Sequence, residues 1–368
     1  MESAILNRFH GLDHLRALAI TLVFFFHYFI ISGGEPAWLP DVARFGWTGV
    51  DLFFVLSGFL IASGLFEEIV SKKELSFKKF FLKRFFRIIP AYLVTVAIYF
   101  LFPVFREKES LPPLWKFLTF TQNLGLDLKN TGTFSHAWSL CVEEHFYLIF
   151  PVLLIIIHRF SKIKLGIWIL VLLFVFGFFI RNYAYQSLYL PNLNNPDGWM
   201  YWYKFVYYPT YSRLDGLLIG VGLAALFRFK SVLWGKIQRF GNGLLLLSLL
   251  VIASGFYLCD DQQTFWASVF GFPLLAIGFG LMVAGAVSQG SVLYKTNSRV
   301  TSLIASLSYS IYLTHKGVIH ITQSLLQDFQ LNQNVVLICC IISSLLAAFL
   351  LHIAVEKPFI RLRKQMVG

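Results

Sequence analysis

The sequence predicts an all-α fold, a polytopic membrane helix bundle, from its low charge, its repeated apolar runs and the placement of its basic residues. The chain has 368 residues, of which 57% are hydrophobic and only 14% are charged. Soluble domains carry about 25% charged residues. Apolar runs of about 20 residues, the length that crosses a bilayer as a helix, recur along the whole chain. We therefore expect a single integral-membrane domain over residues 1–368.

Polar and Gly/Pro-containing segments divide the apolar runs into ten predicted spans. These are residues 12–32, 46–66, 88–105, 136–157, 165–183, 208–227, 240–258, 265–288, 301–326 and 335–355. Polar residues interrupt the fourth, sixth and ninth spans, which are less uniform than the others.

The distribution of Lys and Arg predicts the orientation of the bundle. With the N-terminus inside, the inner segments hold roughly three times as many basic residues as the outer segments, which is the positive-inside signature. Both termini are then expected in the cytoplasm. The net charge of +12 reflects orientation and attraction to lipid headgroups rather than nucleic-acid binding.

The first span carries two costly side chains, Arg16 and His27, eleven residues apart. This spacing is close to three helical turns, so both side chains leave the same face, roughly 16 Å apart along the axis. Ionisable residues inside a membrane helix indicate a functional site. An arginine can bind phosphate or carbonyl oxygens, and a histidine can act as a general base towards a hydroxyl. The alternative is a buried polar pair that only holds neighbouring helices together.

Acidic and basic residues around the second and third spans extend this pattern. Asp51 begins the second span and is placed either to orient His27 or to balance Arg16. Arg84 and Arg87 lie one turn apart before the third span, where they are candidates to clamp the phosphates of a cytoplasmic nucleotide-bearing cofactor. Lipid attraction explains most lysines of the same segment, which include Lys72, Lys73, Lys78 and Lys79.

The string HAWSLCVEEHFYLIFP at residues 136–151 is the most specific in the chain. It brings His136, Trp138, Glu143 and Glu144 into an apolar helix, and two carboxylates there are too costly to be passive. Adjacent residues on a helix point in different directions. We expect one glutamate in a reaction cavity and the other paired with a cation.

Two later strings add polar groups to the sixth and ninth spans. SRLDGLLIG contributes Arg213, a candidate partner for one of the glutamates, together with Asp215. SYSIYLTHKG puts Tyr309, Tyr312 and His315 on one polar stripe. The outer loops 106–135 and 184–207 are rich in aromatic and amide side chains, which suits either a cover over a polar ligand or an interfacial aromatic belt.

Taken together, these strings resemble the membrane acyltransferase-3 family, which transfers acyl groups to cell-surface and extracellular glycans. The matching strings occur in the family's order from residue 11 to 358. They are Arg16 followed by His27, GVDLFFVLSGFLI, RFFRIIPAY, HAWSLCVEEHFYLIFP, SRLDGLLIG, SYSIYLTH and EKP. Two positions depart from the family pattern: His14 replaces the usual glycine and His145 the usual glutamine. Both departures could alter substrate contacts.

The resemblance implies an O-acyltransferase of the bacterial inner membrane, with acyl-CoA arriving from the cytoplasm and an acceptor hydroxyl on the outer side. Acetyl-CoA is the donor expected first, while succinyl or longer acyl groups stay open. The acceptor is a glycan or lipid-linked saccharide, such as lipopolysaccharide O-antigen or an exopolysaccharide. Some relatives carry a fused extracytoplasmic hydrolase-like domain. The sequence shows none, so we expect the protein to act alone or with a separate extracytoplasmic partner.

The predicted site residues fall into three groups. The catalytic candidates are His27, Arg16, Glu143, Glu144 and Asp51. The candidates for binding acyl-CoA are Arg84, Arg87 and Arg16. The candidates for binding the acceptor are His136, Trp138, Arg213, Asp215, Tyr309 and His315.

The pattern leaves two questions open. His27 either deprotonates the acceptor directly or carries the acyl group for a time. A multi-pass transporter or flippase for a glycan or organic anion is the alternative function, although no internal repeat favours it. We expect no metal and no disulfide framework, because the four cysteines show no metal-ligand spacing. We expect no nucleic-acid partner, because the basic residues follow the alternate loops of the bundle.

Overall fold

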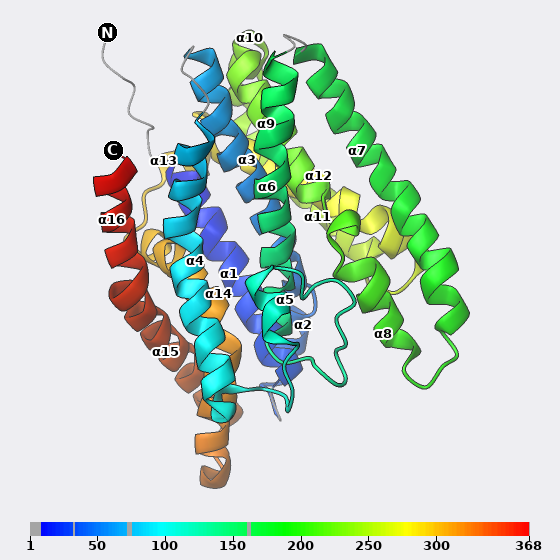
Figure 1. The fold of residues 1–368 in the computed structure, drawn as a ribbon, viewed down its shortest axis with the longest axis vertical. Helices are drawn as coiled ribbons and strands as arrows, with labels where there is room; N and C mark the ends of the chain where they lie inside the picture. The colour runs from blue at the N-terminus through cyan, green and yellow to red at the C-terminus, as the bar shows by residue number, and fades with distance from the viewer. Residues whose placement is uncertain (1–8, 32–33, 72–75, 160–162, 368) are drawn as a thin grey trace.

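The computed structural model describes residues 9–31, 34–71, 76–159 and 163–367, and within these ranges all of the regular structure is helical (Figure 1). Each predicted span corresponds to one helix. These helices are α1 (His10–Ile31), α3 (Gly49–Val70), α4 (Phe77–Leu101), α6 (Trp138–Arg159), α7 (Ile163–Tyr183), α9 (Asp215–Phe229), α11 (Gly241–Leu258), α12 (Phe272–Ala286), α14 (Arg299–Leu326) and α15 (Gln333–Leu351). The all-α membrane bundle is therefore confirmed.

Fewer spans than predicted qualify by length and apolarity. In the described ranges, eight helical stretches are long and apolar enough to cross a membrane, against the ten expected. The two that do not qualify are α9, which has 15 residues, and α14, which is interrupted by serine, threonine, histidine and lysine side chains. Both pack inside the bundle, α9 against α3 and α14 against α1 and α15. They differ from the other spans because neighbouring helices, not lipid, cover most of their polar groups.

Short helices and loops gather at the two ends of the bundle (Figure 1). One end, here called the loop end, carries the segment 102–137 and the helices α2 (Leu39–Ala43), α5 (Leu114–Leu118) and α8 (Gly198–Trp202). The opposite end, here called the basic end, carries the start of α4 and the helices α10 (Ser231–Ile237), α13 (Val292–Lys295) and α16 (Lys357–Val367).

Basic side chains of the described segments at the basic end include Lys78, Lys79, Lys236, Arg239, Arg361 and Lys364. Lys72 and Lys73 lie outside the described residues. Of the described residues, the start of α4 and the segments 228–239 and 357–364, which are predicted to be inner, lie at the basic end, and the segments 106–129 and 184–207, which are predicted to be outer, lie at the loop end (Figure 1). The placement of the basic end in the cytoplasm stays a prediction.

The centre of the bundle is built on α3, which packs closely against α9. A side chain cannot be added at Gly58 of α3, because its Cβ would lie 2.2 Å from the carbonyl oxygen of Leu217. A Cβ at Gly220 of α9 would in turn lie 2.3 Å from the carbonyl oxygen of Val55. Small residues allow two membrane helices to approach backbone to backbone. Gly58 and Gly220 therefore let α3 and α9 pack closely at the centre of the bundle.

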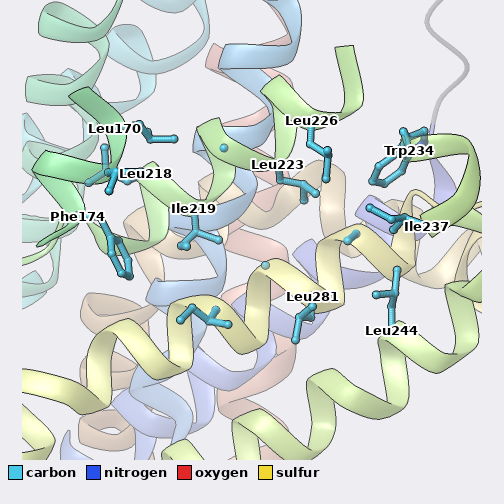
Figure 2. Close-up of a pocket in the computed structure, with 15 residues that line it drawn as sticks. Leu170, Phe174, Leu218, Ile219, Leu223, Leu226, Trp234, Ile237, Leu244 and Leu281 are labelled. Carbon is cyan, nitrogen blue, oxygen red and sulfur yellow. The ribbon is translucent and has the colours of Figure 1, made fainter. Parts of the chain in front are cut away.

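The outer helices of the bundle leave most of their apolar surface exposed, as helices in contact with lipid do. Only 11% of the span that contains α7 is buried, compared with 78% for the span that contains α3. Between α7, α9, α10 and α12 lies a cavity of about 490 Å³ whose walls are apolar, with Leu170, Phe174, Leu223 and Trp234 among them (Figure 2). A cavity without polar groups cannot orient a sugar or a phosphate. The candidate chemistry must therefore lie elsewhere.

Candidate active site

Among the cavities formed by the described residues, a pair with polar walls lies inside the bundle, with one cavity towards each end. The first, here called the histidine cavity, has a volume of about 400 Å³ and includes residues of the loop end such as Lys108 and Trp199 in its walls. The second, here called the arginine cavity, has a volume of about 330 Å³ and includes Phe9, Arg87 and Arg228 towards the basic end. Both cavities are within the size range of small-molecule sites.

Helix α1 connects the two cavities. Arg16 lines the arginine cavity and His27 lines the histidine cavity. The face of α1 that carries both Arg16 and His27 is thus turned towards the protein interior at both positions. The two groups do not act in one common pocket, because they are separated by three turns of helix.

A histidine pair fixes the proton positions on His27. The Nδ1 atom of His315 lies 2.9 Å from the carbonyl oxygens of Ile311 and Tyr312. Carbonyl oxygens only accept, so Nδ1 of His315 carries a proton and, in the neutral ring, its Nε2 is an acceptor. That Nε2 lies 2.9 Å from Nδ1 of His27. Hydrogen bonding therefore assigns the proton of His27 to Nδ1 and leaves the lone pair on Nε2, the state that a general base needs.

A third histidine completes the cluster. The ring of His136 lies 5.6 Å from the ring of His27 and 5.0 Å from that of His315, measured between centroids. Its two ring nitrogens are buried and have no hydrogen-bond partner in the described part of the chain. An unpaired buried polar atom is costly. His136 is therefore well placed to bind a polar ligand in the histidine cavity.

Aromatic side chains form much of the remaining wall of the histidine cavity. They are Trp47, Trp138, Trp199, Tyr203, Tyr207 and Tyr208. Aromatic rings offer flat apolar faces, and tyrosine and tryptophan add a polar atom at the edge. This combination suits a ligand with both C–H faces and hydroxyl groups. Trp138 is the member of this group that the sequence singled out.

An ion pair that the sequence did not suggest closes the loop end of the histidine cavity. Nζ of Lys316 lies 2.8 Å from Oε1 of Glu107, with only 5% and 2% of the two side chains exposed. The same oxygen accepts a hydrogen bond of 3.0 Å from the backbone N–H of Phe134. Burial alone would raise the pKa of Glu107, but the Lys316 ammonium and these hydrogen bonds outweigh burial and lower it. Glu107 therefore stays ionised and attaches the segment 102–137 to α14.

Three arginines that line the arginine cavity form no direct ion pair with a carboxylate of the described ranges. They are Arg16, Arg84 and Arg87. The Arg84 guanidinium lies over the ring of Tyr147, 5.3 Å from its centroid. A guanidinium binds phosphate and carbonyl oxygens through paired N–H donors. The cavity is therefore suited to an anionic ligand.

The structure separates the two adjacent glutamates. Glu143 lines the arginine cavity, where its Oε1 accepts a hydrogen bond of 2.9 Å from Ser57 and its Oε2 one of 2.8 Å from Tyr147. Glu144 is absent from the walls of both cavities. The expected pairing of one glutamate with Arg213 is wrong, because Arg213 donates to another carboxylate.

That carboxylate is Asp51, and its ion pair with Arg213 has a counterpart in the buried pair of Arg181 and Asp215. Nη2 of Arg213 lies 2.7 Å from Oδ1 of Asp51, and Nη1 of Arg181 lies 2.6 Å from Oδ2 of Asp215. The Arg213 guanidinium also lies 4.1 Å from the ring centroid of Phe272. Neither pair lines the histidine cavity or the arginine cavity. The sequence predicted that Asp51 orients His27 or balances Arg16. Both predictions are wrong, because Asp51 is bound to Arg213.

The remaining residues of interest also have defined places. Tyr309 lines the arginine cavity and donates a hydrogen bond of 2.9 Å to the carbonyl oxygen of Ile88. His14 bonds through Nε2 to the carbonyl oxygen of Thr296 at 2.9 Å. His145 bonds through Nδ1 to the hydroxyl of Thr210 at 2.7 Å. The two departures from the family pattern thus lie outside the cavity walls, where they make local structural contacts.

No group of three or more His, Cys, Asp or Glu side chains in the described ranges has a geometry that could hold a metal ion. The four cysteines are free, and three of them are buried.

Comparison with known proteins agrees with the resemblance. A family model described as an acyltransferase domain, Acyl_transf_3, matches residues 9–353. "Putative O-acetyltransferase SACOL0978" of Staphylococcus aureus (strain COL) is 29% identical over 345 residues, which cover 87% of this chain and 52% of that protein. O-acetyltransferase OatA of Staphylococcus aureus (strain NCTC 8325 / PS 47) is 27% identical over 354 residues, which cover 92% of this chain and 55% of that protein.

The chain spans about half the length of the curated relatives it matches. A search of solved structures finds no match.

Proposed function

The chain belongs to the acyltransferase-3 family, and we propose that it moves an acyl group from cytoplasmic acyl-CoA to a carbohydrate hydroxyl on the outer side of a membrane. The chain is a multi-pass membrane acyltransferase, and its relatives are named as O-acetyltransferases. The proposal adds the donor, the acceptor and the direction of transfer. We take acetyl as the first acyl group to test.

The observation that carries the proposal is the meeting of the two cavities at one residue, Tyr312, which lines both. A reaction between a donor from one side of a membrane and an acceptor from the other needs two such cavities. Each substrate can then reach the centre of the protein without crossing the bilayer itself.

The donor side of the proposal rests on the charge of the arginine cavity. Acyl-CoA is a polyanion, and Arg84 and Arg87 lie where its phosphates would enter from the basic end. Arg16 lies on α1, three turns from His27, and can bind a phosphate or carbonyl oxygen further along the ligand. Glu143, held by Ser57 and Tyr147, limits the positive charge of the same cavity.

The acceptor side rests on the aromatic walls and the histidines of the other cavity. A sugar ring can stack on Trp138 or Trp199, while its hydroxyls bind the unpartnered nitrogens of His136. Lys316 and Glu107 offer charged groups at the loop end. These features favour a glycan or a lipid-linked saccharide as acceptor.

Transfer follows from the proton positions on the histidine pair. Nε2 of His27 takes the proton of the acceptor hydroxyl, and the hydroxyl oxygen bonds to the thioester carbonyl carbon. The C–S bond breaks, and the CoA thiolate leaves and is protonated. His315 acts as a positioning residue because its Nε2 accepts a hydrogen bond from Nδ1–H of His27, which leaves Nε2 of His27 free to act as the base. Trapping of an acyl-histidine would distinguish this direct transfer from a mechanism in which His27 first carries the acyl group.

We propose that the protein lies in the bacterial inner membrane with its basic end in the cytoplasm. The clustering of Lys and Arg at one end supports this orientation through the positive-inside rule. A separate extracytoplasmic partner that completes transfer to the final glycan is a further part of the proposal.

The direct test uses purified protein in lipid nanodiscs with acetyl-CoA that carries a labelled acetyl group. Labelled glycan that forms only with both protein and acceptor present supports the proposal. Mass spectrometry of cell-surface glycans from cells with and without the gene identifies the acceptor. A protein that moves unmodified glycan across a vesicle membrane, without acetyl-CoA consumption, would contradict the proposal and favour a transporter or flippase.

A further inference from the structure

The two cavities are separated by a thin wall that contains Tyr312 of α14. Tyr312 is the residue that lines both the histidine cavity and the arginine cavity, and only 5% of it is exposed. Its ring centroid lies 6.5 Å from that of Phe53, which lines the arginine cavity. On the other side it lies 5.4 Å from the ring of His136, which lines the histidine cavity.

Hydrogen bonds hold this ring across the wall. The Tyr312 hydroxyl donates to the carbonyl oxygen of His136, which can only accept. The hydroxyl oxygen therefore accepts from Ser139, whose Oγ lies 2.6 Å away and which lines the arginine cavity. The resulting chain of hydrogen bonds runs from one cavity to the other. It keeps the ring between them in one orientation.

We propose that Tyr312 is the partition that keeps water of the histidine cavity away from the thioester in the arginine cavity. The inference rests on the proposed function, because it concerns the same donor and acceptor. A closed active site prevents the hydrolysis of a reactive group before the correct acceptor arrives. The ring has to move only when an acceptor hydroxyl lies against it.

The reaction that the partition prevents is a simple hydrolysis. A water oxygen would bond to the acyl carbonyl carbon, the C–S bond would break, and the CoA thiol and the free acid would be released. His27 would accept a proton from this water as readily as from a sugar hydroxyl. The protein would then consume acyl-CoA without acylating any glycan.

The test measures release of free CoA thiol from acetyl-CoA by the purified protein, with and without acceptor. Tyr312→Ala should raise acceptor-independent thiol release by about tenfold or more and lower the ratio of transfer to hydrolysis. Tyr312→Phe keeps the ring but loses both hydrogen bonds, so its hydrolysis should lie between those of wild type and Tyr312→Ala. Tyr257→Ala is the matched control, because Tyr257 of α11 is 88% exposed and lines neither cavity.

The outcomes separate the two proposals. A wild-type protein that does not acylate any acceptor would overturn the proposed function and this inference with it. An active wild type, together with a Tyr312→Ala variant that hydrolyses acetyl-CoA no faster, would overturn the partition alone. If Tyr312→Ala does not fold, Tyr312→Phe and Ser139→Ala decide the matter, since both should still raise the hydrolysis rate. Wild-type hydrolysis rates in both would contradict the inference.

Discussion

The charged residues of the arginine cavity and those around Asp51 differ in a way that the sequence does not reveal. Both groups lie in or next to helices of the membrane bundle, where a buried charge is costly. Asp51 and Asp215 are bound by Arg213 and Arg181, and these pairs line neither the histidine cavity nor the arginine cavity. Arg16, Arg84 and Arg87 instead line a cavity without an ion-pair partner in the described ranges.

The difference shows what an intramembrane charge is for. Two opposite charges that bind each other hold their helices in position, and the loss of one partner leaves the other as an unpaired buried charge. A cation beside a cavity can bind a ligand, and its loss should change binding or rate more than stability. The predictions below test this division, from the largest expected effect to the smallest.

Replacement of the proposed base should have the largest effect on activity. His27→Ala should lower acyl transfer by a factor of about 10²–10⁴, the usual contribution of a general base, with little change in thermal stability. Transfer rate and melting temperature in detergent are the two measurements. His320→Ala on α14 is the matched control, because His320 lines neither cavity. Full activity in His27→Ala would contradict the assignment.

Replacement of one member of a buried ion pair outside the two polar cavities should act mainly on folding. Arg213→Ala leaves Asp51 buried without its partner and should destabilise the protein by about 3–5 kcal/mol. Melting curves and the yield of monodisperse protein measure this loss. The double variant Asp51→Asn with Arg213→Gln removes both charges and should recover part of the stability. An Arg213→Ala protein of normal stability but without activity would move Arg213 into the ligand-binding group.

Loss of one cavity arginine should weaken donor binding. Arg84→Ala should raise KM for acyl-CoA by about tenfold or more, because a charge-assisted hydrogen bond contributes about 1.5–3 kcal/mol. The difference from wild type should shrink at high salt. Arg228→Ala is the comparison, since Arg228 already lies 3.0 Å from Glu67. Equal KM values for wild type and Arg84→Ala would remove Arg84 from the donor site.

Loss of the positioning histidine should have a smaller effect on rate. His315→Ala should lower kcat by about tenfold with little change in KM. The reason is that Nε2 of His27 can still accept a proton, but no hydrogen-bond acceptor then holds the other ring proton on Nδ1. His315→Gln should recover part of the rate, since an amide oxygen can accept from Nδ1 of His27. If His315→Ala and His315→Gln lower kcat equally, His315 contributes packing alone.

The smallest effect concerns the pH dependence of stability. The pKa of Glu107 is lowered in the folded protein, so its ion pair with Lys316 stabilises the fold above the ordinary glutamate pKa of about 4.3. This contribution is lost as the pH falls through the lower pKa of the folded state. Glu107→Gln should flatten the fall in melting temperature below about pH 4. An unchanged acid profile would mean that other carboxylates control it.

Local pattern was enough to place the helices but not to pair their charges. The ten predicted spans all contain a helix, and Arg16 and His27 lie on one face of α1 as their spacing indicates. The partner of Asp51 was assigned wrongly because Arg213 is 162 residues away in the sequence. Glu107 was missed altogether, since a glutamate in a charged loop gives no sign that it will be buried.

The sequence by itself determined that this protein is an all-α membrane protein of the acyltransferase-3 family, because hydropathy, helical period and motif order are local properties. Only the tertiary structure decided where the histidine cavity and the arginine cavity lie, that Glu143 and not Glu144 lines the arginine cavity, and that Tyr312 lines both. The physical reason is distance. A cavity wall or an ion pair joins side chains from helices far apart in the chain, and only packing brings them together.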